Sequence, residues 1–343
     1  MQDRFLDLAY EVSRVTEEKV GVIDQVVRQT GMLAINARLE AARAGSAGHA
    51  FSVVAQEVGL LAQSIREVSS ELRAAISANV GLLESAGETL RRDMRGARFA
   101  DLARNAVEII DRNLYERSCD VRWWATDRAV TDVLCDPSEE ARAYASERLA
   151  TILRSYTVYL DLWVADRDGK VIATGRPDRY PDAIGAGVAG TDWFKRAMQA
   201  ASGEQFHVCD VAPNPILGGA PVATYSTAVR RDGATYGEPI GALGIFFDWA
   251  PQAAAIVGGT SLDEDERGHT RVMLLDADLR VIASSDGKGL LSETYPLQIA
   301  DPRRGYYQQG DRLVAYALTP GYETYAGLGW YGCIDSTLRA GTG

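Results

Sequence analysis

The sequence has few of the residues that build metal centres, disulfide frameworks and membrane spans. Its 343 residues include four cysteines, none in a CxxC pair, and three histidines. No apolar run approaches the ~20 residues needed to cross a bilayer. The opening residues, MQDRFLDLAYEV, lack the basic start and cleavage site of a signal peptide. These absences argue against a zinc site, a disulfide-stapled fold and a membrane span, and we expect a cytoplasmic protein.

Positive charge is also scarce. The chain has 36 Lys and Arg against 47 Asp and Glu, which gives a formal net charge of -11. This balance disfavours nucleic acid and anionic membranes as main partners, because both need local positive charge. The hydrophobic fraction of 46% is typical of globular proteins, and the length predicts two or three domains.

Apolar side chains recur at three- and four-residue steps on both sides of a glycine-containing bend. They stand at Phe5, Leu8, Val12, Val15, Val22, Val26 and Leu33 before it, and at Val54, Val58, Leu61, Ile65, Val68 and Leu72 after it. The spacing predicts two helices, residues 1–44 and 51–94, folded back near Ala47. So thin a hairpin cannot bury both of its faces, and we expect two chains to pair into a four-helix bundle.

The stretch QTGMLAINARLEAARAGSAGHAFSVVAQEVGLLAQSI resembles the hairpin tip of methyl-accepting chemotaxis proteins, over residues 20–75. In that family the tip binds a coupling protein and a histidine kinase. The resemblance implies two groups of partner-binding residues. Positions matching the first group hold receptor dimers together as trimers, and those matching the second lie at or near the coupling-protein surface: Asn36, Glu40 and Arg43, then Phe51, Val53 and Val54. From the pattern alone, a frayed and solvated tip is an equal alternative.

Three tip residues depart from the family pattern. Ser46 stands where glutamate is common, His49 where arginine is common, and Ala50 where glycine is common. A dimeric sensory scaffold whose tip, including Ser46 and His49, binds another partner therefore stays open as an alternative. Glu17 and Glu18 form an acidic pair, but their neighbours fit the methylation pattern poorly, and we interpret them as a solvated face.

The second half changes period. The segment YLDLWVADRDGKVIATG predicts a strand, a turn at Asp168-Gly169 and a second strand. A short helix, TDWFKRAMQAASG, and three more strands follow, and a weaker copy begins about 110 residues later with TRVMLLDADLRVIASSD. We therefore expect a hairpin at 1–96, connecting helices at 97–155, and sheet units at 156–260 and 261–343. The connecting helices should be interrupted near Asp136-Pro137, because proline disfavours a helical conformation in the residue before it.

This order resembles a double Cache sensor over residues 115–338. The expected fold class is α plus α+β: an antiparallel coiled-coil hairpin followed by two PAS-like mixed α/β units. The resemblance implies a small-molecule site in the first unit. Its candidate residues stand on the short helix, at a strand end and on neighbouring strands: Trp193, Phe194, Asp248, Asp210, Tyr225, Trp163 and Asp161.

The class of ligand follows from the same positions. The amino-acid-binding branch carries an arginine where this chain has Thr191, so an α-carboxylate loses its bidentate partner. Aromatic rings with carboxylates suit a cationic ligand instead. The alternative is that Trp193 and Phe194 are core residues and Asp248 is a strand-end cap.

No enzyme site assembles from the sequence. GAGVAG at 185–190 matches a dinucleotide fingerprint, but a proline and charges precede it, so we interpret it as a loop. His207 and Cys209 alternate on one strand, yet no third residue completes a nucleophile site. We expect no catalytic residue, metal or cofactor. Together the two resemblances imply a chemoreceptor-like transducer that senses a small molecule and signals as a homodimer, or trimer of dimers, to a coupling protein and histidine kinase.

Overall fold

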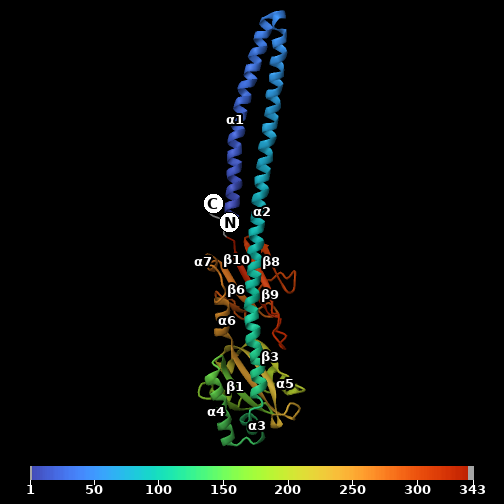
Figure 1. Ribbon diagram of the computed structural model, residues 1–343. Coiled ribbons are helices and arrows are strands. Elements are labelled where there is room, and N and C mark those ends of the chain that lie inside the picture. The colour runs from blue at the N-terminus through green and yellow to red at the C-terminus, as the bar shows by residue number, and fades with distance from the viewer. Residues whose placement is uncertain (1, 339–343) are drawn as a thin grey trace. The chain divides into compact units, whose positions relative to one another are not determined.

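The computed structural model describes the chain from residue 2 to residue 338 and contains two compact units, Met1–Arg95 and Gly96–Gly343 (Figure 1). The first unit is helical throughout its described residues, and the second combines helices with two five-stranded sheets. This arrangement confirms the expected fold class. None of the described helices is long and apolar enough to cross a membrane.

The first unit is a hairpin of two helices. Helix α1 spans Gln2–Arg43, the 3-10 turn η1 spans Gly45–Gly48, and α2 spans His49–Trp124. The 42 residues of α1 give it a length of about 63 Å at 1.5 Å per residue. Because α2 continues past Arg95, it contributes residues to both units.

Mostly small residues, seven apart, form the contact between the two helices. The buried positions are Val20, Val27, Ala34 and Ala41 in α1, and Ala55, Ala62 and Ser69 in α2. A seven-residue repeat keeps one stripe turned towards the partner helix. The residues picked out by the three- and four-residue spacing lie outside this contact: Val22, Val26 and Leu33 are 54%, 54% and 68% exposed. A second, apolar stripe is therefore unpaired within one chain.

Two glycines allow the hairpin to turn. Gly45 has a φ of +62°, which side chains other than glycine rarely adopt. A Cβ atom on Gly48 would lie 2.1 Å from the carbonyl oxygen of Ala41. Gly48 therefore lets the start of the returning helix pack directly on the backbone of α1.

The helix expected to run as far as residue 135 is interrupted. α2 ends at Trp124, and α3 spans Arg128–Cys135. Asp127 caps α3 by accepting a 2.9 Å hydrogen bond from the backbone N–H of Ala129, and an N-cap of this kind begins a new helix. Ser138 similarly caps α4, which spans Glu139–Ser155. The sequence reading missed the break because apolar periodicity continues on both sides of it.

The two sheets share one antiparallel topology. The first has the order β2-β1-β5-β4-β3 and the second β7-β6-β10-β9-β8. The strands of the first are β1 (Tyr159–Asp166), β2 (Val171–Thr174), β3 (His207–Asn214), β4 (Ala220–Arg230) and β5 (Pro239–Asp248). Those of the second are β6 (Thr270–Leu275), β7 (Val281–Ser284), β8 (Arg304–Gln309), β9 (Arg312–Leu318) and β10 (Tyr331–Thr337). Matching orders agree with the repeat in the sequence.

Short helices join and cover the strands. They are η2 (Pro181–Ala183), α5 (Asp192–Gln199), η3 (Pro215–Leu217), η4 (Arg231–Gly233), α6 (Trp249–Gly258) and α7 (Glu264–Arg267). Within the second unit, residues 96–343, α2 runs alongside both sheets (Figure 1). A Cβ on Gly332 of β10 would lie 2.3 Å from the carbonyl oxygen of Ala103, so helix and strand are in direct contact.

Alternation along the strands separates two cores. Leu162 and Val164 of β1 join the large core that contains α2, whereas Trp163 and Ala165 join the core under α5. Successive side chains of a strand point to opposite faces, so α2 and α5 cover opposite faces of the first sheet. The α5 face holds the aromatic residues of the candidate site.

Candidate functional site

A pocket of about 300 Å³ lies between α5 and the first sheet. Residues of β1, β3, β4 and β5 line it. The segment just before α5, the first residues of α5 and the turn η3 complete the lining. Its lining residues are Trp163, Gly187, Val188, Thr191, Asp192, Trp193, Cys209, Asp210, Ala212, Pro213, Asn214, Pro215, Ile216, Val222, Thr224 and Phe246. The volume is at the lower end of the range for small-molecule sites.

Three aromatic rings form the apolar part of the pocket. The ring centroids of Trp163 and Phe246 are 4.1 Å apart, and Trp193 meets Phe246 edge-on at 6.1 Å. Gly244, beside Trp163 in the β1–β5 pairing, leaves room for Trp193, since a Cβ there would lie 3.0 Å from the indole ring. The rings are therefore fixed by packing before any ligand binds.

Two carboxylates supply the charge of the pocket. Burial acts to raise the pKa of Asp192, but the hydrogen bond from His207 and the charge of Arg196 hold it below its usual value. Burial raises the pKa of Asp210, although hydrogen bonds from Val211 N–H and the Trp330 indole act against the shift. Among the described residues that line the pocket there is no Lys or Arg, so its charge is negative.

A break in strand register brings neighbouring residues to the same pocket. Cys209 and Asp210 both line it, although adjacent strand residues normally face opposite sides. The β3–β4 register shifts between Cys209 and Ala212, as at a β-bulge. Asp210 also accepts a hydrogen bond of 3.4 Å from Trp330 Nε1, which links the pocket to the second sheet's side of the unit.

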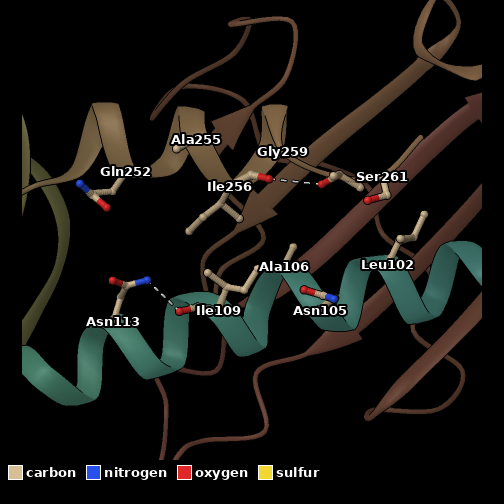
Figure 2. Close-up of a pocket in the computed structure, with 11 residues that line it drawn as sticks. Leu102, Asn105, Ala106, Ile109, Asn113, Gln252, Ala255, Ile256, Gly259 and Ser261 are labelled. Atoms are coloured by element: carbon tan, nitrogen blue, oxygen red, sulfur yellow. Dashed lines mark hydrogen bonds between the residues drawn. The ribbon is translucent and has the colours of Figure 1, made fainter. Parts of the chain in front are cut away.

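A second hollow, of about 280 Å³, lies between α2 and α6 (Figure 2). Its side chains are neutral, and Figure 2 shows Asn113 turned back to its own helix, where its Nδ2 donates to the carbonyl of Ile109 at 3.0 Å. Thr260 similarly donates to the Ile256 carbonyl at 3.3 Å. With no charged residue in its lining, this groove is a weaker candidate for a specific ligand than the aromatic pocket.

The structure brings together three of the seven residues expected to bind ligand. Trp163, Trp193 and Asp210 line the aromatic pocket. Phe194 is buried beside it and meets Trp193 at 5.9 Å between ring centroids, but does not line it. Asp248 is the last residue of β5 and the N-cap of α6. Burial raises the pKa of its carboxyl, although the charges of Arg179 and Arg176 act to lower it.

The other two expected residues have structural partners elsewhere. Asp161 is fully buried, and its carboxylate accepts from the Trp163 indole at 2.9 Å and from the backbone N–H groups of Leu162, Gly175 and Arg176. Tyr225 lies on the α2 side of the sheet, with its hydroxyl 3.3 Å from that of Tyr325. Neither residue is part of the pocket lining.

Sequence reasoning missed several pocket residues. Phe246, Thr224 and Asn214 line the pocket. Strand alternation was the available signal for Phe246 and Thr224, because it predicts which residues of a strand share a face. Asp192 was not among the residues expected to bind ligand. In the structure Thr191 is the N-cap, and the Asp192 carboxylate instead turns to His207, whose Nε2 lies 3.1 Å from Oδ2.

The hairpin tip exposes the expected partner-binding residues. Phe51, Val53 and Val54 are 74%, 53% and 60% exposed. Glu40 and Arg43 form an exposed ion pair of 2.6 Å, one turn apart. Asn36, Ser46 and His49 are exposed as well. Three large apolar side chains therefore face solvent within about one helix turn, and the partner contact expected of them stays a prediction.

Fold and pocket together define a class of protein in which a helical hairpin is joined to a two-sheet unit with a pocket of small-molecule size. Residues 5–116 match the family model of the methyl-accepting chemotaxis protein (MCP) signalling domain. This confirms the family resemblance of the hairpin. The match continues beyond the tip region that resembled the family in sequence.

Curated relatives match over short stretches of the chain. Methyl-accepting chemotaxis protein I of Escherichia coli is 46% identical over 78 residues, which cover 21% of this chain and 14% of the relative. Chemoreceptor McpA of Caulobacter vibrioides is 60% identical over 48 residues, 14% of this chain and 7% of the relative. The chain therefore spans a small part of the relatives it matches.

Solved sensor domains share the fold of the remainder. The ligand-binding domain of the Pseudomonas aeruginosa amino acid chemoreceptor PctC, in complex with GABA, aligns with a TM-score of 0.51 and 17% identity over 71% of this chain and 99% of that one. The sensory domain of the Campylobacter jejuni chemoreceptor Tlp3 gives a TM-score of 0.50 and 18% identity over 71% and 94%. The second unit thus has the Cache-like fold of chemoreceptor sensor domains, and we call it the sensor unit after that fold.

Proposed function

We propose that this chain is a chemoreceptor-like signal transducer. Its sensor unit binds a small molecule in the aromatic pocket, and its hairpin signals to a chemotaxis-type histidine kinase and coupling protein. The observation that carries the proposal is that one helix, α2, begins at the hairpin tip and ends inside the core shared by both sheets. Any change in that core acts on the same helix that forms the tip.

The chemistry of the pocket supports a small organic cation as ligand. The faces of Trp163 and Trp193 attract cations through their ring quadrupoles, more strongly where water is displaced. Asp192 and Asp210 add negative charge at the rim, and no lining residue offers a positive partner for an anion. GABA, the molecule bound to PctC, carries an ammonium group that suits such a pocket and a carboxylate for which no lining residue offers a cation.

Contacts of β3 supply a route from the pocket to α2. Phe206 immediately precedes β3, and the guanidinium of Arg122 on α2 lies over its ring at 5.4 Å. The Arg122 guanidinium also donates to the carbonyl of Glu204 at 3.4 Å. A ligand that moves β3 would therefore pull on the last turn of α2. A switch of this kind needs two packings that differ by a few kcal/mol.

The test of sensing is a thermal-shift screen of the chain against organic cations, with neutral and anionic analogues of the same size. A specific ligand stabilises the folded state by mass action. Trp193→Ala should abolish the shift, whereas Asp248→Asn should retain it, because Asp248 lies outside the pocket. Loss in Asp248→Asn alone would move the site to the end of β5.

Homodimer formation is part of the proposal. It is supported by the unpaired apolar stripe of the hairpin, which includes Val22, Val26 and Leu33. Burying such a stripe against a second copy removes apolar surface from water. This burial stabilises the dimer by about 25 cal/mol for each Å² of apolar surface. Light scattering should give a dimer for the wild type and a monomer for Val26→Glu. Gln25→Glu adds the same charge one residue away, off the stripe, and should remain dimeric.

Capture of the kinase and coupling protein tests the output. Phe51→Ala and Val54→Ala should lose capture, since they remove apolar surface at the tip. Leu82→Ala is the matched control: it is 68% exposed on the same helix but far from the tip, and should bind like the wild type. Equal capture by all three variants would rule out binding through the tip.

A dimeric sensory scaffold with another partner is the second candidate, favoured by Ser46, His49 and Ala50 at the turn. If the wild type captures neither protein, the triple variant Ser46→Glu, His49→Arg and Ala50→Gly decides between the two. Capture gained by the triple variant would show that these three residues alone prevent coupling. No gain of capture would favour the scaffold with another partner.

A further inference from the structure

Three side chains of different chemistry meet at the rim of the aromatic pocket. Asp192 is the first residue of α5, and His207 and Cys209 stand two apart on β3, on one face of the strand. Oδ2 of Asp192 lies 3.1 Å from Nε2 of His207 and 3.9 Å from Sγ of Cys209. The donor atoms of all three lie within 4.8 Å of one another.

The arrangement does not suit a nucleophile. In a Cys-His-Asp site the imidazole stands between the thiol and the carboxylate and takes the thiol proton. Here the carboxylate stands between the other two groups, and Cys209 donates to Asp192. A carboxylate in that place disfavours a thiolate, so the cluster does not activate Cys209 for attack.

We propose that Asp192, His207 and Cys209 bind a divalent transition-metal ion of the Zn²⁺ type at the pocket rim. Carboxylate oxygen, imidazole nitrogen and thiolate sulfur are the three donors that zinc uses in proteins, at about 2.0–2.3 Å from the ion. Tetrahedral geometry then sets donor atoms about 3.5 Å apart. The observed separations bracket that value, so small rotations of the side chains bring all three onto one ion.

The surroundings leave the site open to an ion. The two carboxylate oxygens of Asp192 have different partners: Oδ1 faces Arg196 at 3.5 Å, and Oδ2 faces His207 and Cys209. The side chain of Asp192 is 62% exposed and that of His207 is 27% exposed, so a hydrated ion can reach them. On binding, the thiol of Cys209 gives up its proton to solvent and the sulfur becomes a ligand.

Three protein ligands leave a fourth position for water or for a donor atom of a molecule in the pocket. Asp192 and Cys209 line that pocket. A bound ion would also join α5 to β3. Phe206, the residue before β3, contacts Arg122 of α2. Metal binding therefore goes beyond the proposed sensing of an organic molecule and stands without it.

The test is titration of the metal-free chain with Co²⁺ alone, followed by competition with Zn²⁺. The wild type should show the cobalt–thiolate charge-transfer band, one ion per chain, and loss of the band on adding Zn²⁺. Cys209→Ser should lose the band, and His207→Ala should weaken affinity at least about 100-fold, since a direct ligand matters no less than its hydrogen-bond partners. Cys135→Ser removes an exposed cysteine elsewhere and should behave like the wild type.

Thermal melts without metal establish that each variant is folded. Added Zn²⁺ should raise the melting temperature of the wild type and of Cys135→Ser, but not of Cys209→Ser. No band in the wild type would overturn the proposal, as would a band that survives Cys209→Ser or disappears in Cys135→Ser. Because organic ligands are absent throughout, failure here leaves the proposed sensing function untouched.

Discussion

The Nε atom of Arg117 lies 3.1 Å from Oδ2 of Asp120, one turn further along α2, in the interior of the sensor unit. The side chains of the pair are only 5% and 11% exposed. The hydroxyl of Tyr159 on β1 donates to the same carboxylate oxygen, and the guanidinium lies over the rings of Tyr159 and Phe247 at 5.2 and 5.7 Å. The pair therefore joins α2 to two strands of the first sheet.

Arg117→Met should destabilise the sensor unit by about 3–5 kcal/mol, because it leaves the carboxylate of Asp120 buried without its cation. The six tryptophans all lie between residues 123 and 330, so urea unfolding followed by tryptophan fluorescence reports on this unit alone. Adding Asp120→Asn to Arg117→Met should recover part of the loss.

The control for Arg117 is Arg148→Met. Arg148 pairs with Asp127 at 3.2 Å, but its side chain is 46% exposed, so the change should cost less than about 1 kcal/mol. Similar losses for the two variants would mean that burial of the Arg117–Asp120 pair has no special weight.

Gly48→Ala should open the turn of the hairpin. Its added Cβ would lie 2.1 Å from the Ala41 carbonyl oxygen, and that atom belongs to backbone that cannot move aside cheaply. Gly31→Ala has nothing within 4 Å of its Cβ and should stabilise the helix by about 1 kcal/mol through helix propensity. Helical circular dichroism on heating should therefore fall earlier for Gly48→Ala and later for Gly31→Ala. The opposite order would contradict the close packing at the tip.

The fold could largely be predicted because its signals are local. Three- and four-residue spacing marks helices, alternation marks strands, and Asp168-Gly169 marks a hairpin turn. The contact between α1 and α2 could not be predicted, since small residues such as Ala34 and Ala55 carry little hydrophobic signal. The spacing pattern instead selected the larger Val22 and Val26, which are exposed in the structure.

The site was predicted in part for a related reason. Alternation shows that Trp163 and Leu162 face opposite sides of β1, but it does not say which neighbouring residues share the pocket. Tyr225 was assigned to it, yet its neighbour Thr224 is the one that lines it. Asp192 and His207 are 15 residues apart and meet only once α5 packs on the sheet. Contacts between elements carry no periodic signal, so sequence patterns alone do not find them.

Arg122→Ala should separate ligand binding from signalling, if the proposed function holds. Its side chain bridges α2 and the segment before β3 but does not line the pocket. Ligand affinity should change less than about threefold, whereas the effect of ligand on kinase activity should fall severalfold, since a lost coupling of 1 kcal/mol changes an equilibrium about fivefold. Arg104→Ala serves as control, because it removes an exposed arginine of the same helix whose partner, Glu108, lies one turn away on α2. Unchanged kinase regulation in Arg122→Ala would indicate that the signal leaves the pocket through the Asp210–Trp330 contact instead.

Asp111 gives the sensor unit a distinct pH dependence. The residue is fully buried on α2, where Oδ2 accepts a 2.7 Å hydrogen bond from Gly321 N–H and Oδ1 accepts none from the described residues. Burial raises the pKa of its carboxyl to about 6, although the Gly321 hydrogen bond acts to lower it. Glu108 on the same helix raises it further, and the hydroxyl of Tyr325 is the other titratable group that interacts with it.

Because the folded state holds this proton more tightly than the unfolded chain, the stability it contributes is full below pH ~4 and is lost as the pH rises to about 6. Asp111→Asn stays neutral and keeps the Gly321 contact, so its advantage in unfolding free energy should grow from near zero at low pH to at most about 3 kcal/mol at neutral pH. Urea unfolding at several pH values measures the difference. A difference that stays constant with pH would mean that this carboxyl ionises in the folded protein as readily as in the unfolded chain.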